Sequence, residues 1–558
     1  MLPLDLNLEA IPDAVTRAAV QRLLNLVEQL YRENQALRAE NQRLRDEINR
    51  LKGEQGKPVF PAHRATPKPR PPPADHSSES ERREPQAWQK DAKLPRISID
   101  RVERLLVDPA LLPPDAQFKG CDPVVIQDLV LRTDNVLFLK EVYYSPSQHQ
   151  TFRAALPAGY TGQFGPGIRT LALVLAYGCL VSEPQIHTLF TDAGIALSTG
   201  QVSAFLIAGH ERLHREAHDV LIAGLNSSPW QHLDDTPTRV NGANQVCYTL
   251  CNPFYTAYQT RSSKARLTVL SVLQGGGSLR YRLDATAWAY LEEVGVARKR
   301  RQQVAALAAA QAPDHEWDEA AFGALLDTAR PGLGPQQRQR VLEAGALAAY
   351  RAQTAVPVVD TLVCDDAPQF RKVTEHVALC WVHDGRHYTK LLPYLPCHQE
   401  RVKCFRKRYW AFYRELRAYQ AQPTPAEAAR LAGAFDTLFG ECTGLEMLDH
   451  RMALTQAKKT ELLAVLVHPE LPLHNNPAEL GVRRRVRKRD VSFGPRTAAG
   501  AQAWDTFQTL SATAAKLGVS FFHYLRDRLS GAHQLPSLAQ RIEERAQGLK
   551  LGQSWPSS

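Results

Sequence analysis

The spacing of apolar and polar residues divides the chain into segments of different secondary structure. Near the N-terminus leucine recurs every seventh residue, at positions 23, 30, 37, 44 and 51. The other seam position holds Val, Asn, Asn and Ile, at positions 27, 34, 41 and 48. This combination favours a parallel two-stranded coiled coil. We therefore predict a leucine-zipper-like coiled coil over residues 1–52. A single amphipathic helix packed on its own domain would explain the leucines but not the asparagines.

Composition and periodicity change after the zipper. Residues 53–95 are rich in Pro, Ser and charge, which predicts a flexible linker because little apolar surface can be buried there. Apolar runs such as VVIQDLVLRTDNVLFLKEVYY predict a small strand-containing region over residues 96–165. Three helices are expected over 166–225, the third starting at Ser198, which has capping-box spacing with Gln201. They resemble a DNA-binding helix-turn-helix, although any three-helix packing unit shows the same pattern.

From residue 229 the period becomes two. The runs WQHLDDTPTRV, QVCYTLCN and FYTAYQTRS predict three short strands, ARLTVLSVLQ a helix, and PVVDTLVCDDA a fourth strand. Residues 280–355 are rich in Ala, Arg and Gln, and we interpret them as a helical insertion. Helices follow to about residue 530, and residues 531–558 form a polar tail. The pattern thus predicts an α/β domain with a mixed sheet over residues 226–530.

Composition narrows the class of protein. The chain has 558 residues and is 44% hydrophobic, which is typical of a globular protein. Its net charge of +10 is modest for this length, so the clustering of basic residues matters more than the total, and a basic cluster indicates a polyanionic partner. No apolar run approaches the length of a membrane span, and the N-terminus has no signal-peptide pattern. Nine scattered cysteines fit a reduced compartment better than a disulfide framework. We therefore expect a cytoplasmic protein without a membrane partner.

Two acidic pairs follow apolar strand patterns. Asp234–Asp235 closes WQHLDD, and Asp365–Asp366 closes VVDTLVCDD. Carboxylates on neighbouring strands, joined by a third from a helix, can hold divalent magnesium. Asp235 and Asp366 should point to the opposite face by strand alternation. The alternative is that both pairs are turn formers, favoured at strand ends for backbone reasons.

Glu479 is the candidate for the third carboxylate. It lies in HNNPAELGVRRRVRKRD, where Asn476 can be an N-cap, Pro477 suits the first helical position, and Glu479 falls third. A capping role is therefore the local alternative. The basic run after it comprises Arg483, Arg484, Arg485, Arg487, Lys488 and Arg489. Beside a phosphodiester site this run would bind DNA phosphates, whereas alone it would be a solvated face.

The order of these blocks matches a ribonuclease-H-like layout. There the first acid lies on strand one, the second at the end of strand four and the third on a later helix, the places of Asp234, Asp365 and Glu479. The blocks LDDTPTRV, VCDDAPQF, ALCWVHDGRHYTKL, HNNPAELGVRRRVRKRDVSFG and AAKLGVSFFHYLRDRL also resemble, in order, motifs of the insertion-sequence-66 family of DDE-class transposases. The N-terminal zipper matches the same family.

The resemblance implies a DNA transposase that cleaves and joins the ends of an insertion sequence. It implies that Asp234, Asp365 and Glu479 bind two Mg²⁺ or Mn²⁺ ions, and that His383 and Arg386 lie near DNA phosphates. The expected partners are the terminal inverted repeats, target DNA, a second copy of the chain through the zipper and accessory proteins of the element. Two rivals stay open: a DNA-binding relative that has lost cleavage, and a nuclease without strand transfer.

Three departures from the family pattern stand out. Many members carry a zinc finger after the zipper, but here Cys121 is followed by no cysteine until Cys179, so zinc is not expected there. Leu480 stands where an arginine is usual, and the insertion at 280–355 lengthens the spacing of the first two acids. Cys380, His383 and His387 have ligand-like spacing, with Cys397, His398 and Cys404 downstream. Core packing for the cysteine and phosphate contact for His383 are the preferred interpretations.

Overall fold

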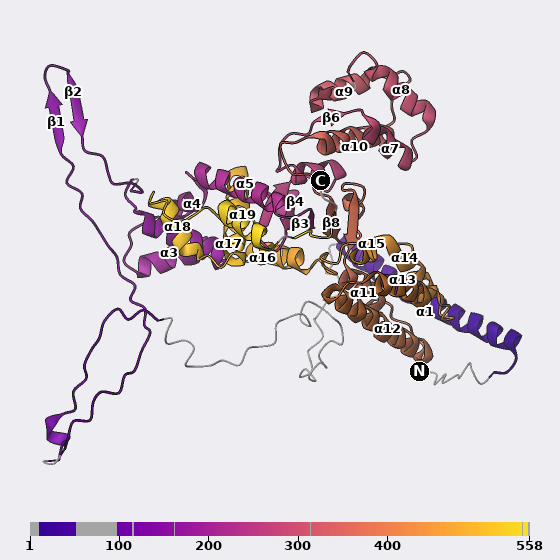
Figure 1. Cartoon of the computed structure of the whole chain (residues 1–558), viewed down its shortest axis with the longest axis horizontal. Helices are drawn as coiled ribbons and strands as arrows, with labels where there is room; N and C mark the ends of the chain where they lie inside the picture. Colours follow the sequence, from indigo (N-terminus) through magenta and orange to yellow (C-terminus); the bar gives the residue numbers. More distant parts are fainter. Residues whose placement is uncertain are drawn as a thin grey trace.

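The computed structural model describes residues 11–51, 97–113, 116–160, 162–312, 314–549 and 551–555 (Figure 1). The predicted linker at 53–95 lies outside the described residues. Within these ranges no helix is long and apolar enough to cross a membrane. The architecture is mixed α/β, as the sequence predicted, with a mixed five-stranded sheet and many helices.

The five-stranded sheet has the order β5-β4-β3-β8-β9. Its strands are β3 (Trp230–Val240), β4 (Ala243–Cys251), β5 (Thr256–Arg261), β8 (Thr361–Cys364) and β9 (His376–Leu379). β3, β4 and β5 are antiparallel neighbours, while β8 is parallel to β3 and β9 is parallel to β8. The three strands and the fourth strand predicted from periodicity are confirmed. Helix α6 (Arg266–Leu273) lies where ARLTVLSVLQ predicted one.

Turn chemistry explains the length of β3. Asn241 and Gly242 have positive φ angles of 49° and 77° and join β3 to β4 as a two-residue hairpin. Asn-Gly suits this turn because both central residues need a left-handed backbone. Since β4 pairs with β3 right up to the turn, β3 continues past Asp234–Asp235. The strand end expected at that pair is therefore wrong, and Asp234 lies in the middle of an 11-residue strand.

Helix α17 (Ala498–Lys516) closes the β5 edge of the sheet. Its side chains accept hydrogen bonds from alternate N–H groups of β5: Asp505 from Thr260 at 2.6 Å, Thr509 from Tyr258 at 3.0 Å, and Thr513 from Thr256 at 3.2 Å. Four residues of helix rise about 6 Å and two residues of strand advance about 6.7 Å, so the two spacings match. The edge is thereby protected from pairing with another strand.

The helices before the sheet differ from the prediction in the third, which is divided into two. They are α2 (Pro166–Leu173), continued by a π-helical turn at Val174–Gly178, then α3 (Glu183–Asp192), α4 (Thr199–Ile207) and α5 (Glu211–Asn226). The Ser198 hydroxyl caps α4 by accepting from the Gln201 N–H, as expected. The long third helix of the prediction is instead α4 and α5. Gly209 at φ 75° breaks it, and the buried His210 ring contacts the Phe205 carbonyl oxygen at 2.8 Å.

The C-terminal segment is more ordered than a polar tail. Helix α18 (Phe521–Leu529) is followed by α19 (Leu538–Leu549), which packs on α5 (Figure 1). Leu538 and Ile542, one helical turn apart, are fully buried. Two apolar residues at this spacing are enough to dock an otherwise polar helix, which the average composition concealed.

The insertion at 280–355 is mostly helical, as predicted. It contains α7 (Ala285–Glu293), α8 (Arg298–Ala308), α9 (Glu319–Asp327) and α10 (Pro335–Ala352), and two short strands, β6 (Tyr281–Arg282) and β7 (Glu316–Trp317). Glu343 on α10 accepts hydrogen bonds from Arg266 on α6 and Tyr290 on α7. These bonds attach the insertion to the sheet domain between β5 and β8.

A helical subdomain, residues 381–466, separates β9 from the last part of the sheet domain. It contains α11 (Trp381–Thr389), α12 (Pro396–Ala421), α13 (Pro425–Gly440), α14 (Glu446–Gln456) and α15 (Lys459–Leu462). These helices share their own core, in which Trp381 is fully buried. The chain then returns to the sheet as α16 (Asn476–Ser492), which packs on β3 and β4.

Helix α1 (Ala14–Leu51) docks on the helical subdomain through one face. Glu28, almost completely buried, accepts hydrogen bonds from the N–H groups of Tyr394 and Leu395, both at 2.8 Å, and contacts His398. Tyr31 stacks on Tyr394 at 4.1 Å. The heptad leucines lie on another face and are exposed: Leu23, Leu30, Leu37, Leu44 and Leu51. Docking on the same chain, the alternative to a zipper, thus occurs and leaves the zipper seam uncovered.

Residues 97–160 contain less strand than predicted. The run VVIQDLVLRTDNVLFLKEVYY becomes strand only at its end, where β1 (Val142–Ser145) pairs with β2 (Gln150–Arg153) in a hairpin that projects from the body (Figure 1). The apolar residues before the hairpin are exposed, including Leu129 and Leu139. The earlier part lacks a partner strand within the described residues, so its apolar pattern alone does not make a sheet.

Candidate active site

Two aspartates lie side by side where β3 and β8 separate. The parallel register pairs His232 with Val363, and two further residues along each chain bring Asp234 level with Asp365. β8 ends at Cys364, whereas β3 continues, so the sheet opens at this point. Asp365 therefore follows the end of its strand, as the sequence pattern indicated.

Glu479 joins these aspartates on one cavity. The cavity has a volume of about 210 Å³ and is lined by Asp234, Asp365, Cys380, His383, Arg386, Asn475, Glu479, Val482 and Arg483. Residues from β3, from the segment after β8, and from α11 and α16 thus meet although they are far apart in the sequence. The structure brings together the three predicted carboxylates, along with His383 and Arg386.

The capping interpretation of Glu479 is wrong. Helix α16 begins at Asn476, with Asn475 before it, so Glu479 is the fourth helical residue rather than the third. Both of its carboxylate oxygens accept from the Arg386 guanidinium, at 3.1 and 2.9 Å, and Arg483 lies 3.8 Å away. The carboxylate is therefore engaged across the cavity and not by the helix N-terminus.

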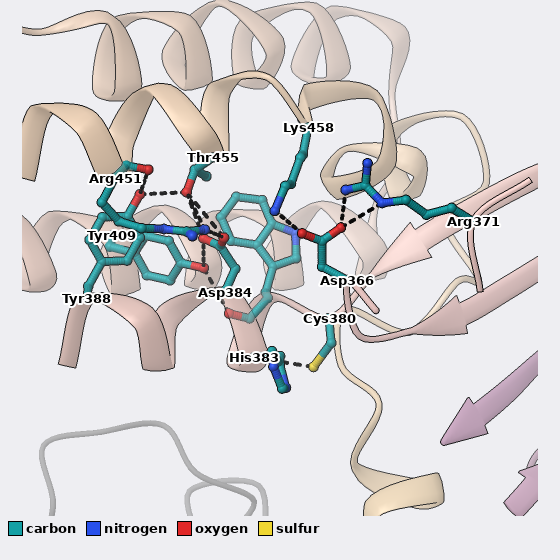
Figure 2. A network of polar contacts seen from close by, with 11 residues as sticks. Asp366, Arg371, Cys380, His383, Asp384, Tyr388, Tyr409, Arg451, Thr455 and Lys458 are labelled. Atoms are coloured by element: carbon teal, nitrogen blue, oxygen red, sulfur yellow. Dashed lines mark hydrogen bonds and ion pairs between the residues drawn. The ribbon is translucent and has the colours of Figure 1, made fainter. Parts of the chain in front are cut away.

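The second acid of each pair has basic partners. Asp235 forms an ion pair with Lys264 and accepts from the Gln369 amide at 2.8 Å. Figure 2 shows Asp366 between Arg371 and Lys458, which both bind its carboxylate. Neither aspartate is among the residues that line the cavity, as strand alternation predicts. These two carboxylates are neutralised locally and serve to hold neighbouring segments together.

Asp234 and Asp365 differ from their neighbours in charge compensation. Asp234 accepts from the Asp235 N–H at 2.8 Å, and Asp365 accepts from the Ala367 N–H at 3.1 Å. Among the described residues neither forms an ion pair with Lys or Arg. Burial, followed by the like charges of Asp365 and Glu479, raises the pKa of Asp234 to about 7. Burial likewise raises the pKa of Asp365. Two uncompensated carboxylates at one cavity would be stabilised by a cation.

The fit to a metal ion is only partial. Asp234 and Asp365 supply the hard oxygen ligands that magnesium and manganese take. Glu479 does not join them as it stands, because Arg386 occupies both of its oxygens. In the described part of the chain no three His, Cys, Asp or Glu side chains are close enough together to hold an ion. The residues thus fit a two-carboxylate site whose third ligand is turned to an arginine.

Asn475 links the elements of the site, a role that the sequence analysis missed. Its amide donates to the Leu233 carbonyl oxygen at 2.9 Å, and its Oδ1 contacts His232 Nδ1 at 2.9 Å. Its N–H donates to Cys380 Sγ at 3.2 Å. Burial lowers the pKa of His232 to about 3, so this ring is neutral. The signal was present as the Asn-Asn pair before Pro477, but it was interpreted only as a helix cap.

Cys380 is the N-cap of helix α11, and among the described residues it belongs to no group of three side chains that could hold a metal ion. Its sulfur accepts from the N–H groups of His383 and Asn475, and burial raises the pKa of its thiol to about 12. The rings of His383 and His387 are 5.7 Å apart. His398, farther along the chain, contacts Glu28 instead. Cys380 therefore packs in the core, while His383 lines the cavity.

Helix α11 is held by a buried polar network (Figure 2). Asp384 accepts from Arg451, from the Thr455 hydroxyl at 3.2 Å and from the Tyr409 hydroxyl at 3.2 Å. A Cβ on Gly385 would lie 2.7 Å from the Trp410 ring, so α11 packs tightly on α12. The network fixes the helix that presents His383 and Arg386 to the cavity.

The basic run is only partly available to DNA. Arg485 is 1% exposed, forms an ion pair with Asp505 at 2.9 Å and lies over the Trp504 ring. Lys488 is 2% exposed and donates to the Val181 carbonyl oxygen at 3.1 Å. The prediction that these two bind phosphate is wrong for the described fold, because α16 packs on β3 and β4 and both side chains point inward. Arg485 contacts Asp505 and Thr260, and Lys488 contacts Val181.

The other four basic residues divide between structural contacts and exposure. Arg484 donates to the Tyr177 carbonyl oxygen and the Ser511 hydroxyl, and Arg489 to the Pro237 carbonyl oxygen. Arg483 and Arg487 are exposed, and they follow Glu479 at intervals of four residues on one helix face. This face lies beside the cavity and is the accessible part of the basic run.

The helix-turn-helix-like helices are poor in positive charge. Helices α3 and α4 pack together, as such a motif requires. The sequence has no Lys or Arg between Arg169 and Arg212. Phosphate contacts from this region would therefore come from its flanks or from helix N-termini.

Comparison with known proteins adds a relative without a described activity. No protein-family profile matches the chain. It is 37% identical over 312 residues to the "Uncharacterized protein y4jO" of Sinorhizobium fredii (strain NBRC 101917 / NGR234). The aligned part is 56% of this chain and 94% of that protein.

Proposed function

The chain belongs to the family of the Sinorhizobium fredii protein y4jO, and we propose that it is a DDE-type DNA transposase resembling the insertion-sequence-66 family. One observation carries the proposal. Asp234, Asp365 and Glu479 come from a strand, a strand end and a later helix, and they line the same cavity. Of each Asp-Asp pair, the member without a basic partner is the one at the cavity.

The sheet supports a ribonuclease-H-like assignment for the catalytic domain. Three antiparallel strands, a helix and then two parallel strands on the other side of the first strand give the order expected of that layout. The acids occupy the expected places on β3, after β8 and on α16. In the sequence, the insertion at 280–355 lies between β5 and β8, so it leaves the order of the five strands unchanged.

Mg²⁺ or Mn²⁺, as two ions, is the proposed cofactor. Asp234 and Asp365 would hold it, with Glu479 as the further ligand. When bound, the ions supply an activated water or 3′-hydroxyl and stabilise the leaving oxygen of a phosphodiester. His383, Arg386, Arg483 and Arg487 would orient the phosphate backbone across the cavity mouth, because they present donors or positive charge beside the carboxylates.

Two exposed surfaces support the proposed partners. Element-end and target DNA would bind across the exposed arginines of α16, with α3 and α4 as recognition helices. The exposed heptad seam of α1 suits a second copy of the chain, because the asparagines at its inner positions specify a two-stranded register. A DNA-bound protein of this kind would be cytoplasmic and nucleoid-associated, and accessory proteins of the same element would complete the complex.

The test uses the full chain and DNA from the regions that flank its own coding sequence. With Mg²⁺ or Mn²⁺ the protein should nick this DNA and join a labelled 3′ end to a target plasmid. Asp234→Asn, Asp365→Asn and Glu479→Gln should each abolish both products and keep DNA binding, since they remove ligands and not the basic surface. The matched control is Asp235→Asn, one residue along β3 and outside the cavity, which should keep both products.

Two outcomes would redirect the assignment. Nicking without joining would identify a nuclease of the same fold. DNA binding without either product, under all ionic conditions, would favour a non-cleaving DNA-binding protein. The Arg386–Glu479 ion pair supports the non-cleaving DNA-binding protein, because it neutralises one of the three acids.

A further inference from the structure

The three acids of the cavity are not equivalent in charge. Asp234 and Asp365 form no ion pair with Lys or Arg within the described ranges, whereas Glu479 is paired through both oxygens with Arg386. A two-point arginine–carboxylate pair takes one lone pair of each oxygen and neutralises the negative charge that would attract a cation. The Glu479 side chain is 16% exposed, so water competes weakly with the pair. Binding of a cation by all three acids therefore requires this pair to open.

The arginine is mounted on a rigid helix but is itself accessible. Asp384, two residues before Arg386, accepts hydrogen bonds from Arg451, Thr455 and Tyr409. Gly385, between them, packs closely against Trp410. Helix α11 therefore cannot withdraw without breaking a buried network. The Arg386 side chain is 37% exposed at the cavity. Opening the pair is thus a rotation of one side chain, within reach of a ligand that arrives from solvent.

A phosphodiester has the chemistry to compete for this arginine. Guanidinium binds carboxylate and phosphate through the same planar fork of donors, so one anion can replace the other at little cost. Lysine, with a compact point charge, would not make this exchange in the same geometry. DNA entering beside Arg483 and Arg487 would bring a phosphate to the side of the cavity where Arg386 lies.

We propose that Arg386 is a positioning residue that withholds Glu479 from a cation site at Asp234 and Asp365 until a DNA phosphate takes over its guanidinium. The inference rests on the proposed function and adds the order in which DNA and the cation engage the three acids. DNA and divalent cation then bind with positive cooperativity, and each strengthens the other by the same factor. Coupling between two sites is usually between about fivefold and 150-fold, and we expect roughly tenfold here.

The experiment measures Mn²⁺ binding to the full chain by calorimetry and by the electron paramagnetic resonance signal of free Mn²⁺, without any cleavage assay. Arg386→Gln should bind Mn²⁺ about tenfold more tightly than the unmodified chain, in the usual range for such coupling. Adding Glu479→Gln should remove this gain. Arg386→Lys should give an intermediate affinity, because it keeps the charge and loses the fork.

The matched control is Arg430→Gln. It removes the same charge from α13, where Arg430 pairs with Glu427 and Glu415 outside the cavity, and should leave Mn²⁺ affinity unchanged. A short random-sequence DNA duplex should tighten Mn²⁺ binding to the unmodified chain, but not to Arg386→Gln.

The outcomes separate this inference from the proposed function. Equal Mn²⁺ affinities for the unmodified chain and Arg386→Gln, both abolished by Asp234→Asn, would overturn the role of Arg386 and leave the cation site standing. Absence of Mn²⁺ binding from every variant, with and without DNA, would overturn both. If Arg386→Gln still binds Mn²⁺ more tightly when Glu479→Gln is added, the gain comes from removing the repulsion between Arg386 and the cation. This result would also overturn the inference.

Discussion

Replacing Arg485 by alanine should destabilise the protein without weakening its hold on DNA phosphates. Arg485 is 1% exposed, donates to the Gln508 and Thr260 side chains, both at 2.7 Å, and pairs with Asp505. Alanine removes these bonds and leaves Asp505 as an unpaired charge between α17 and β5. Arg485, although it belongs to a basic run in the sequence, therefore contributes to the packing of α16.

The size of the effect follows from what Asp505 retains. Removing one partner of a buried ion pair typically costs about 3–5 kcal/mol. Asp505 keeps its bonds from the Thr260 N–H and hydroxyl, which places the cost near the lower end, at about 3–4 kcal/mol. At about 2 °C per kcal/mol, suitable for a large chain, the melting temperature should fall by roughly 6–8 °C.

The assay pairs thermal melting with salt-dependent DNA binding. Arg487→Ala, two residues along the same helix and exposed, is the matched variant and should change stability by less than about 0.5 kcal/mol. If Arg487 contacts one phosphate, its loss should flatten the slope of log affinity against log salt by about 0.9, whereas Arg485→Ala should leave the slope unchanged. The reasoning is refuted if Arg485→Ala melts like the unmodified chain and flattens the slope.

Three further predictions concern other parts of the fold. Glu28→Ala should speed amide exchange in α1, because it removes the docking bonds, and should leave self-association unchanged. Leu37→Lys should weaken self-association and leave amide exchange unchanged. Sedimentation and exchange measurements on both variants check this, and loss of association in Glu28→Ala would contradict it. Gly481→Ala places a Cβ 2.6 Å from Thr249 and should cost about 1–3 kcal/mol in a melting experiment. Burial lowers the pKa of His210 to about 4, below the value of about 6.5 in the unfolded chain. His210 therefore does not reduce the free energy of unfolding above pH 6.5, but reduces it by about 3 kcal/mol as the pH decreases to 4. His210→Gln should flatten this part of the stability–pH curve, and an unchanged curve would argue against the assignment.

The sheet was predictable because each of its main strands has a local sequence signal. Alternation, the Asn241–Gly242 turn and the buried run before Asp365 place β3, β4 and β8 in order. Alternation also indicates which aspartate of each pair faces the cavity. The run WQHLDDTPTRV matches β3, but placing Asp234–Asp235 at the end of that strand was wrong, because pairing with β4 carries the strand past the acidic residues.

The site was less predictable wherever a contact joins distant segments. The pairing of Arg386 with Glu479 spans 93 residues and leaves no local signal in either motif. The basic run could not be divided into buried and exposed members, because burial of Arg485 depends on Asp505 and Gln508 of another helix. Asn475 was visible in HNNPAEL, but its bonds to β3 become apparent only when the helix is placed on the sheet.

The docking of α1 has a consequence for how the protein is made. Residues 14–51 leave the ribosome well before their docking site, which includes Tyr394, Leu395 and Gly444. At the usual 5–20 residues per second, synthesis of the intervening roughly 400 residues takes about 20–80 s. Throughout that interval the leucine seam and the Glu28 face are both open. Neighbouring nascent chains on one messenger can therefore meet through this helix before either has completed the surface that will hold it.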